Sequence, residues 1–348
     1  MFAKPDSAIA HYLWPPRFVG EQPFWENTGT QPVPDPKLLC EVVSTATLAG
    51  DVHVRAFRDG MIAFSMGRST PRFDSVESQL PAHDELSAWL ERSVRLANAH
   101  LACLAAVIQA LMHAPSGVAT YWSVLQVDFD SGKLRTASEY TTGGTRVSLW
   151  SAREGWGAFD WRFYRGWPLV TTEQIEHSFE LLDLLLKRPA QDMTLLRAEM
   201  LFRAHSGLAH GDWAGALTNA WSAIEGLLGE LLGQYIENNR DRPAGNDESG
   251  NTLRFINGDR RAFLEGREMT GRHTVELLSL LDVLPFNLYR ACTRCASARN
   301  DWLHNQAEPS PDVAHVATRA LGEIFALVEG VLHTRWSGLS APPPFRKG

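Results

Sequence analysis

The sequence predicts an α+β protein, in which a mostly antiparallel sheet with one long helix is followed by an all-helical part. Two features of the 348-residue chain support this fold class. Short alternating runs of polar and apolar residues over 38–67, separated by Ala49-Gly50 and Asp59-Gly60, are typical of antiparallel strands joined by tight turns. After Pro168, apolar residues recur at helical spacing.

These patterns divide the chain into four parts. We expect a proline- and aromatic-rich segment over residues 1–36, an α+β domain over 37–170, a helical domain over 171–338 and a tail over 339–348. Proline lacks a backbone N–H and breaks helices, so the first segment should carry no helix. We expect it to lie across the surface of the protein through Trp14 and Trp25.

The α+β domain should contain three strands in 38–67, a helix over 83–113, and further strands over 117–128, 133–141 and 144–152. It contains no phosphate-binding loop, glycine fingerprint or nucleophile elbow, so no motif supports a small-molecule enzyme there. Four tryptophans fall in one short window, at Trp150, Trp156, Trp161 and Trp167. We expect them to form the core where the two domains meet, with a base-stacking platform as the alternative.

The second half should contain helices over 172–187, 190–208, 212–238, 273–284, 286–306 and 311–335. Asp212 and Ser310 are suitable N-caps, and Ser310 is followed by a proline at the first helical position. The stretch over 237–271 is polar and glycine-rich, which predicts a long loop. Long loops in compact domains tend to be functional or mobile.

The predicted helix over 286–306 combines an apolar stripe with a polar end. The stripe consists of Leu288, Cys292, Cys295, Ala298 and Trp302, which recur at steps of three and four. Arg299 lies at its edge, and Asn300, Asp301 and His304 close the helix. Cys292 and Cys295 lack a second pair of ligands at zinc spacing, so we expect them to pack in the core and to bind no metal.

The run RNDWLH over 299–304 resembles the Arg-x4–6-His signature of HEPN domains, helical bundles many of which are metal-independent endoribonucleases. Asn300 directly after the arginine is a common variant in that family, and the helix over 216–236 resembles the long second helix of a HEPN bundle. The resemblance covers roughly residues 190–336. It implies a HEPN-like bundle that forms a homodimer, needs no cofactor and cuts RNA to leave a 2′,3′-cyclic phosphate.

Proteins of this family often act as toxins or antiviral effectors. By analogy, the N-terminal domain would sense the trigger or bind an activator or antitoxin.

The residue types suit this chemistry. A histidine with a pKa near neutrality can transfer protons, which makes His304 the expected general acid–base. The planar, always charged guanidinium of Arg299 can hold the phosphate in the transition state. Asn300 is one turn before His304 and could orient the imidazole or the substrate. Because Arg299 and His304 are about 140° apart around an ideal helix, we expect a second copy to complete the site.

A structural explanation remains open for the same residues. A histidine in the last turn of a helix is stabilised by the helix dipole, by about 0.3–1 kcal/mol. Arg299 could pair with Glu225 or with Asp301. The bundle would then be a non-catalytic module for dimerisation or for binding RNA or a nucleotide.

The formal net charge of −7 argues against a broadly basic nucleic-acid binder but permits a local basic groove. Candidates for phosphate contact are Arg294 on the same helix and Arg260, Arg261 and Arg272 near the long loop, although such arginines are more often a solvated surface. The four cysteines fit a reducing compartment. The longest near-apolar run, over 101–112, is too short to cross a bilayer, so we expect a cytoplasmic protein that does not bind membranes.

Overall fold

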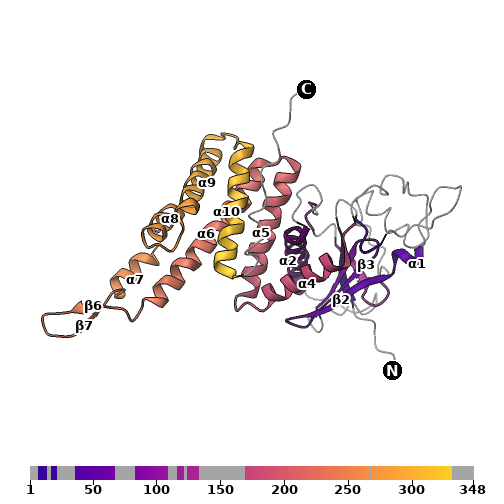
Figure 1. Ribbon diagram of the computed structural model, residues 1–348, viewed down its shortest axis with the longest axis horizontal. Helices are drawn as coiled ribbons and strands as arrows, with labels where there is room; N and C mark the ends of the chain where they lie inside the picture. Colours follow the sequence, from indigo (N-terminus) through magenta and orange to yellow (C-terminus); the bar gives the residue numbers. More distant parts are fainter. Residues whose placement is uncertain are drawn as a thin grey trace. The chain divides into compact units, whose positions relative to one another are not determined.

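The computed structural model describes residues 7–13, 17–21, 36–66, 83–108, 116–120, 124–132, 169–266 and 269–330. By its internal contacts the chain divides into two compact units, Met1–Phe202 and Arg203–Gly348. The predicted α+β class is confirmed, because the first unit contains a five-stranded antiparallel sheet and the second is mainly helical (Figure 1). The predicted Trp150, Trp156, Trp161 and Trp167 cluster and the strands over 133–141 and 144–152 lie outside the described residues.

The sheet has the strand order β2-β3-β4-β1-β5, and every neighbouring pair is antiparallel. Its strands are β1 (Ser7–Tyr12), β2 (Val42–Leu48), β3 (Val52–Phe57), β4 (Met61–Ser65) and β5 (Leu125–Asp128). β2, β3 and β4 form the meander that the alternating runs predict. Gly50 and Asp51 between β2 and β3, and Gly60 between β3 and β4, take positive φ angles of 72°, 59° and 82°, which suits tight turns.

The N-terminal segment corrects the prediction for residues 1–36. Its strand β1 lies inside the sheet between β4 and β5, and Ala8 to Tyr12 are buried. Farther along, the Val19 N–H donates to the Arg58 carbonyl at 2.9 Å, and the Val170 N–H donates to the Phe18 carbonyl at 3.0 Å. The segment is therefore integrated by backbone hydrogen bonds. Trp14 and Trp25 lie outside the described residues.

Helices cover one face of the sheet. This face presents Ile9 and His11 of β1 and Phe64 of β4, which the pairing register places on the same side. His100 of α2 (His83–Ile108) packs on it, with ring centroids 5.7 Å from Phe64 and 6.0 Å from His11. Phe179 of α4 (Thr172–Leu186) lies 5.3 Å from His100. The two helices and this face thus share one aromatic layer.

The opposite face holds a second core, which includes Ala10, Tyr12, Phe57, Met61 and Val127. Segments between the strands cover it, among them the short helix α1 (Pro36–Leu39) through Leu39. Small residues on β1 and β4, Ala8, Ala10 and Ala63, leave room for these larger side chains.

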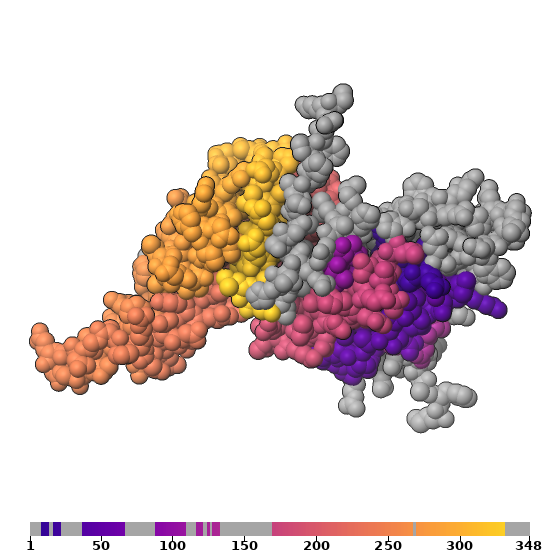
Figure 2. Space-filling model, viewed as in Figure 1, coloured from indigo at the N-terminus to yellow at the C-terminus, as the bar shows by residue number. Residues whose placement is uncertain are grey.

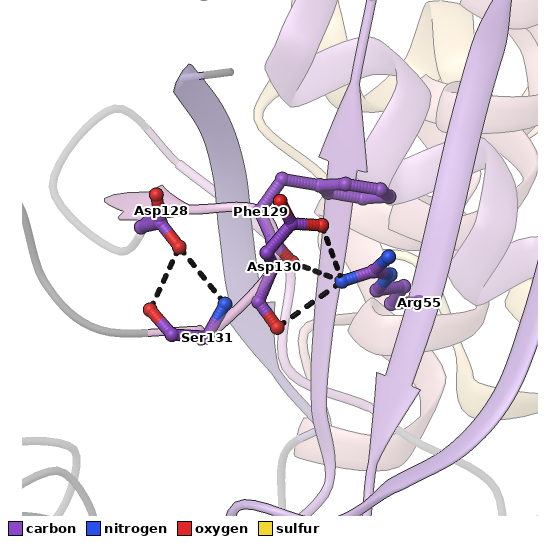
Figure 3. Close-up of polar contacts among 5 residues, drawn as sticks. All are labelled: Arg55, Asp128, Phe129, Asp130 and Ser131. Atoms are coloured by element: carbon purple, nitrogen blue, oxygen red, sulfur yellow. Dashed lines mark hydrogen bonds and ion pairs between the residues drawn. The ribbon is translucent and has the colours of Figure 1, made fainter. Parts of the chain in front are cut away.

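The turn after β5 is fixed to this second face by Arg55 of β3 (Figure 3). Arg55 Nη1 donates to the carbonyls of Phe129 and Asp130, each at 3.1 Å, and forms an ion pair with Asp130 Oδ1 at 2.9 Å. Its guanidinium lies 4.5 Å from the Phe129 ring centroid. Asp128 Oδ1 closes the turn by accepting bonds from the N–H and hydroxyl of Ser131. Phe129 is thereby held over the core.

The boundary between the units lies within α5 (Gln191–His210), later than the predicted boundary at 170. The physical reason is that α4 packs against β2 and α2 rather than with the later helices. Asp183 of α4 also accepts a 2.8 Å hydrogen bond from the Ala49 N–H in the β2–β3 turn.

The second unit is organised around α6 (Trp213–Asn238), which contacts α8 (Gly271–Leu280), α9 (Phe286–Asn305) and α10 (Pro311–Glu329). The predicted N-caps are confirmed: Asp212 accepts from the Gly215 N–H at 2.8 Å, and Ser310 accepts from Val313 at the start of α10. Among the helices in the described ranges, none is both long and apolar enough to cross a membrane.

The predicted long loop contains regular structure. It forms the hairpin of β6 (Pro243–Asn246) and β7 (Thr252–Arg254), followed by α7 (Gly258–Leu264). Asp247 builds the tip by accepting from the N–H groups of Ser249 and Asn251, at 2.9 and 2.7 Å. The hairpin projects from the end of α6, away from α8, α9 and α10 (Figure 1 and Figure 2).

The turn at Gly60 should tolerate no side chain. A Cβ at Gly60 would lie 2.1 Å from the Arg17 carbonyl oxygen, whereas at Gly50, also at positive φ, the nearest atom would be 3.5 Å away. We expect Gly60→Ala to destabilise the protein by more than about 2 kcal/mol and Gly50→Ala by about 1 kcal/mol, the cost of the left-handed backbone alone. Urea denaturation measures both, and equal losses would contradict the close approach.

Acid should destabilise the protein through His205. Burial lowers the pKa of His205 to about 4, and the charge of His210 adds to the lowering. Between about pH 6.5 and 4 the unfolded chain binds a proton here that the folded chain does not, so stability falls as pH falls. We expect His205→Gln to remove about 1.4 kcal/mol per pH unit from the slope of unfolding free energy against pH. Equal slopes for the wild type and for His205→Gln would contradict this contribution.

Candidate functional site at the end of α9

The sequence-predicted site residues occupy the last two turns of α9. The helix ends because Gln306 adopts a left-handed conformation, with φ 54° and ψ 26°, and its N–H returns to the Trp302 carbonyl. The Ala307 N–H likewise bonds to the Asp301 carbonyl at 3.2 Å. This termination agrees with the predicted end of the helix, and it leaves Asn300 and His304 exposed beside the connection to α10.

One side of α9 is buried against α6, α8 and α10. Leu288, Cys292 and Cys295 form this buried stripe. Burial raises the pKa of both Cys292 and Cys295 to about 12, so the thiols are protonated and pack as apolar groups. The predicted stripe differs in two positions, because Ala298 and Trp302 are only half-buried. Ala298 lines a surface groove.

Arg299 continues the buried stripe. It follows Cys295 by four residues, as Cys292 follows Leu288, and its side chain is half-buried. Arg299 Nη1 donates to Asn300 Oδ1 at 3.1 Å. Within the described ranges no carboxylate forms an ion pair with Arg299, so neither Glu225 nor Asp301 fills the role that the structural explanation required. A half-buried guanidinium without a counter-ion is available to an anion.

The carboxylate of Glu225 lies elsewhere, at the start of α8. A Cβ added to Gly271 would come within 2.6 Å of Glu225 Oε1. Asp301 accepts a long 3.4 Å hydrogen bond from Asn305 Nδ2 instead. Both acids that could have neutralised Arg299 are therefore placed against other partners.

His304 is exposed in the last turn of α9 and makes no hydrogen bond or ion pair with the residues that the structure describes. It lies about 40° around the helix from Asn300 and about 140° from Arg299. Asn300 and His304 therefore share a face, whereas Arg299 points along the buried stripe. One copy of α9 does not present the arginine and the histidine on a single surface.

A shallow groove of about 520 Å³ runs along the exposed side of α9. Its lining includes Tyr289, Arg290, Arg294, Ser297 and Asp301 of α9 and Val313 of α10. The predicted phosphate ligand Arg294 forms an ion pair with Asp312 at 2.5 Å. His304 follows Asp301 by three residues and so continues the same side of the helix.

The other predicted phosphate ligands are divided between two places. Arg260 donates to the Phe255 carbonyl at 2.7 Å, and Arg261 pairs with Glu237 and Glu265, each at 2.9 Å. These two arginines hold α7 and the base of the hairpin. Their contacts are with this part of the chain and not with the end of α9.

Arg272 is exposed on α8 and lies near Tyr289 of α9. The Tyr289 hydroxyl donates to Glu276 at 2.9 Å, which raises the pKa of Tyr289, and the positive charge of Arg272 acts in the opposite direction. Sequence reasoning missed Tyr289 and Asp312, because their partners come from neighbouring helices. Among the described residues there is no group of three or more His, Cys, Asp or Glu side chains that could hold a metal ion.

Comparison with known proteins does not identify the chain. Protein-family models, curated proteins and solved structures all give no match.

Proposed function

We propose that the protein is a metal-independent endoribonuclease of the HEPN type. The observation that carries this proposal is the half-buried Arg299, which has no carboxylate partner in the described ranges and lies in the same two helical turns as Asn300 and the exposed His304. A structural arginine in a bundle is normally paired with a carboxylate, whereas an anion-binding arginine is left open for its ligand. This arrangement supports a site for a phosphate.

In the proposed reaction, His304 accepts the proton of an RNA 2′-hydroxyl. The 2′-oxygen then bonds to the adjacent phosphorus while the bond from phosphorus to the 5′-oxygen breaks. The departing 5′-oxygen takes up a proton, so the products are a 2′,3′-cyclic phosphate and a 5′-hydroxyl. Arg299 stabilises the charge that develops on the phosphate oxygens, and Asn300 orients the imidazole or the substrate.

The proposed enzyme is a homodimer through its second unit. An arginine and a histidine about 140° apart on one helix serve one phosphate most readily if they come from different copies. In this proposal Arg299 of one copy and His304 of the other form each site. Two equivalent sites then result from one two-fold axis.

The first unit would then regulate the second. It offers a separate, folded surface on which a trigger, an activator or an antitoxin could act, as expected for a cytoplasmic toxin or antiviral effector. The division of the chain into two units and the family resemblance support this part of the proposal.

A non-catalytic bundle is the second candidate. It is favoured by the position of His304 in the last turn of α9, where a protonated imidazole would stabilise the helix dipole. In that case the bundle would serve dimerisation or bind RNA or a nucleotide without cutting it. The two candidate functions predict different effects of removing the His304 side chain, on cleavage in the first case and on stability in the second.

Cleavage is tested with purified protein, a labelled RNA pool and EDTA. We expect wild-type protein to leave cyclic phosphate ends, and His304→Ala and Arg299→Ala to cut at least about 100-fold more slowly, the usual scale for a lost general acid–base or transition-state contact. Asn300→Ala should be affected less. His177→Ala on α4 and Arg319→Ala on α10, which lie outside the candidate site, serve as controls and should cut at the wild-type rate.

Each variant is checked for its melting temperature and oligomeric state. If the bundle is non-catalytic, His304→Ala lowers the melting temperature, and neither the wild type nor any variant cuts RNA. If the wild type and both site variants cut RNA at the same rate, the proposal of a nuclease is wrong.

A shared site predicts complementation between inactive variants. When Arg299→Ala and His304→Ala chains are co-expressed, half of the dimers are mixed, and each mixed dimer holds one complete site and one empty one. We expect about a quarter of wild-type activity to return. Sites formed within single chains would give no recovery. The matched control is co-expression of wild type with the double variant, which has the same number of intact side chains.

A further inference from the structure

The exposed side of α9 carries a second continuous stripe, opposite the buried one. Its members are Phe286, Arg290, Arg294, Ser297, Asp301 and His304, and the steps between them are four, four, three, four and three residues. These steps place them on one side of a helix. All six are exposed. The stripe therefore forms a path along the whole helix that ends at the proposed catalytic histidine.

An aromatic platform lies at the start of this path. Phe286 is 67% exposed and stacks on Tyr289, with ring centroids 5.5 Å apart and planes at 21°. The hydrogen bond from the Tyr289 hydroxyl to Glu276 fixes the orientation of the Tyr289 ring. A large exposed ring held in a fixed orientation is suited to stacking on a flat partner such as a nucleic-acid base.

Two exposed arginines lie next to the platform. Arg290 and Arg272 are both open to solvent, and neither forms an ion pair within the part of the chain that the structure describes. The next guanidinium along the path, Arg294, is held by Asp312. Because exposed ion pairs contribute little to stability, a phosphate can replace this carboxylate.

The geometry points to a binding site for single-stranded RNA along the exposed stripe of α9, with a base stacked on Phe286 and phosphates at Arg290 and Arg294, leading to His304. This site rests on the proposed function in that it supplies the substrate strand to the catalytic residues. It takes a single strand rather than a duplex, since only an unpaired base can stack on an exposed ring.

The dimensions of the path fit a short stretch of RNA. From Phe286 to His304 the helix rises by about 27 Å, at 1.5 Å per residue. A strand in extended conformation places on the order of four nucleotides over that length, which is within the range of known single-strand sites. Because the formal net charge of the protein is −7, RNA phosphates can bind only where guanidinium groups are open to them.

Binding is tested separately from cleavage with a labelled 12-nucleotide 2′-O-methyl RNA, which lacks the attacking hydroxyl and cannot be cut. We expect Phe286→Ala and Arg290→Ala in the full chain each to weaken binding about tenfold or more in fluorescence anisotropy. Arg290→Ala should also reduce the dependence of affinity on salt. Asp312→Asn, which frees Arg294, should strengthen binding.

Matched controls are Phe263→Ala, which removes a ring of similar exposure on α7, and Arg319→Ala on α10. Both should bind as the wild type does. Absence of binding by wild type, or equal affinity of the Phe286, Arg290 and control variants, overturns the site. A Phe286→Ala chain that loses its oligomeric state, while its affinity for RNA is unchanged, would show instead that this ring contacts a second protein copy.

The outcomes for the site and for the nuclease are separate. If the stripe variants lose affinity but wild type cuts no RNA, the binding site stands and the proposed nuclease fails. If the wild type cuts RNA, and Phe286→Ala binds and cuts RNA as well as the wild type does, the proposed nuclease is supported and the proposed binding site along α9 is wrong.

Discussion

The burial of one side of α9 is the constraint on which the candidate site depends. Leu288, Cys292 and Cys295 are enclosed by α6, α8 and α10, which fixes the rotation of the helix about its own axis. Once that rotation is set, every other residue of the helix has an assigned direction. Arg290 and His304 must face outward, and Arg299 must follow the buried side. A rotation that exposed Arg299 would expose the apolar stripe as well.

This constraint makes Arg299 informative. A guanidinium that extends the apolar stripe loses part of its hydration, and its Asn300 partner is neutral, so the desolvation is only partly offset. Ordinary packing would place a leucine or an alanine here, and Glu225 on the neighbouring helix, which could have neutralised the charge, lies at Gly271 instead. Residues that break the local packing rules without an evident structural gain tend to mark functional sites.

Local patterns in the sequence predict those parts of the fold that are determined by residues close together along the chain. The β2–β4 meander, the cap at Ser310 and the end of α9 follow from alternation, capping chemistry and helical period. Strand β1 was missed because its two partners, β4 and β5, are about 50 and 120 residues away and its own sequence lacks β-branched residues apart from Ile9. The pairs Arg294–Asp312 and Tyr289–Glu276 join different helices, and no spacing within one helix reveals them.

The two stripes of α9 also explain how one helix could serve both binding and cleavage. A strand that follows the exposed stripe reaches His304 but not Arg299, which is about 140° away and half-buried. In the proposed nuclease the missing cation would come from another surface, and a symmetric partner would supply an identical Arg299 without any additional sequence. Under this arrangement the isolated chain can hold RNA but lacks a complete catalytic pair. Dimerisation would then control cleavage, which is a simple way to keep a nuclease inactive when its concentration is low.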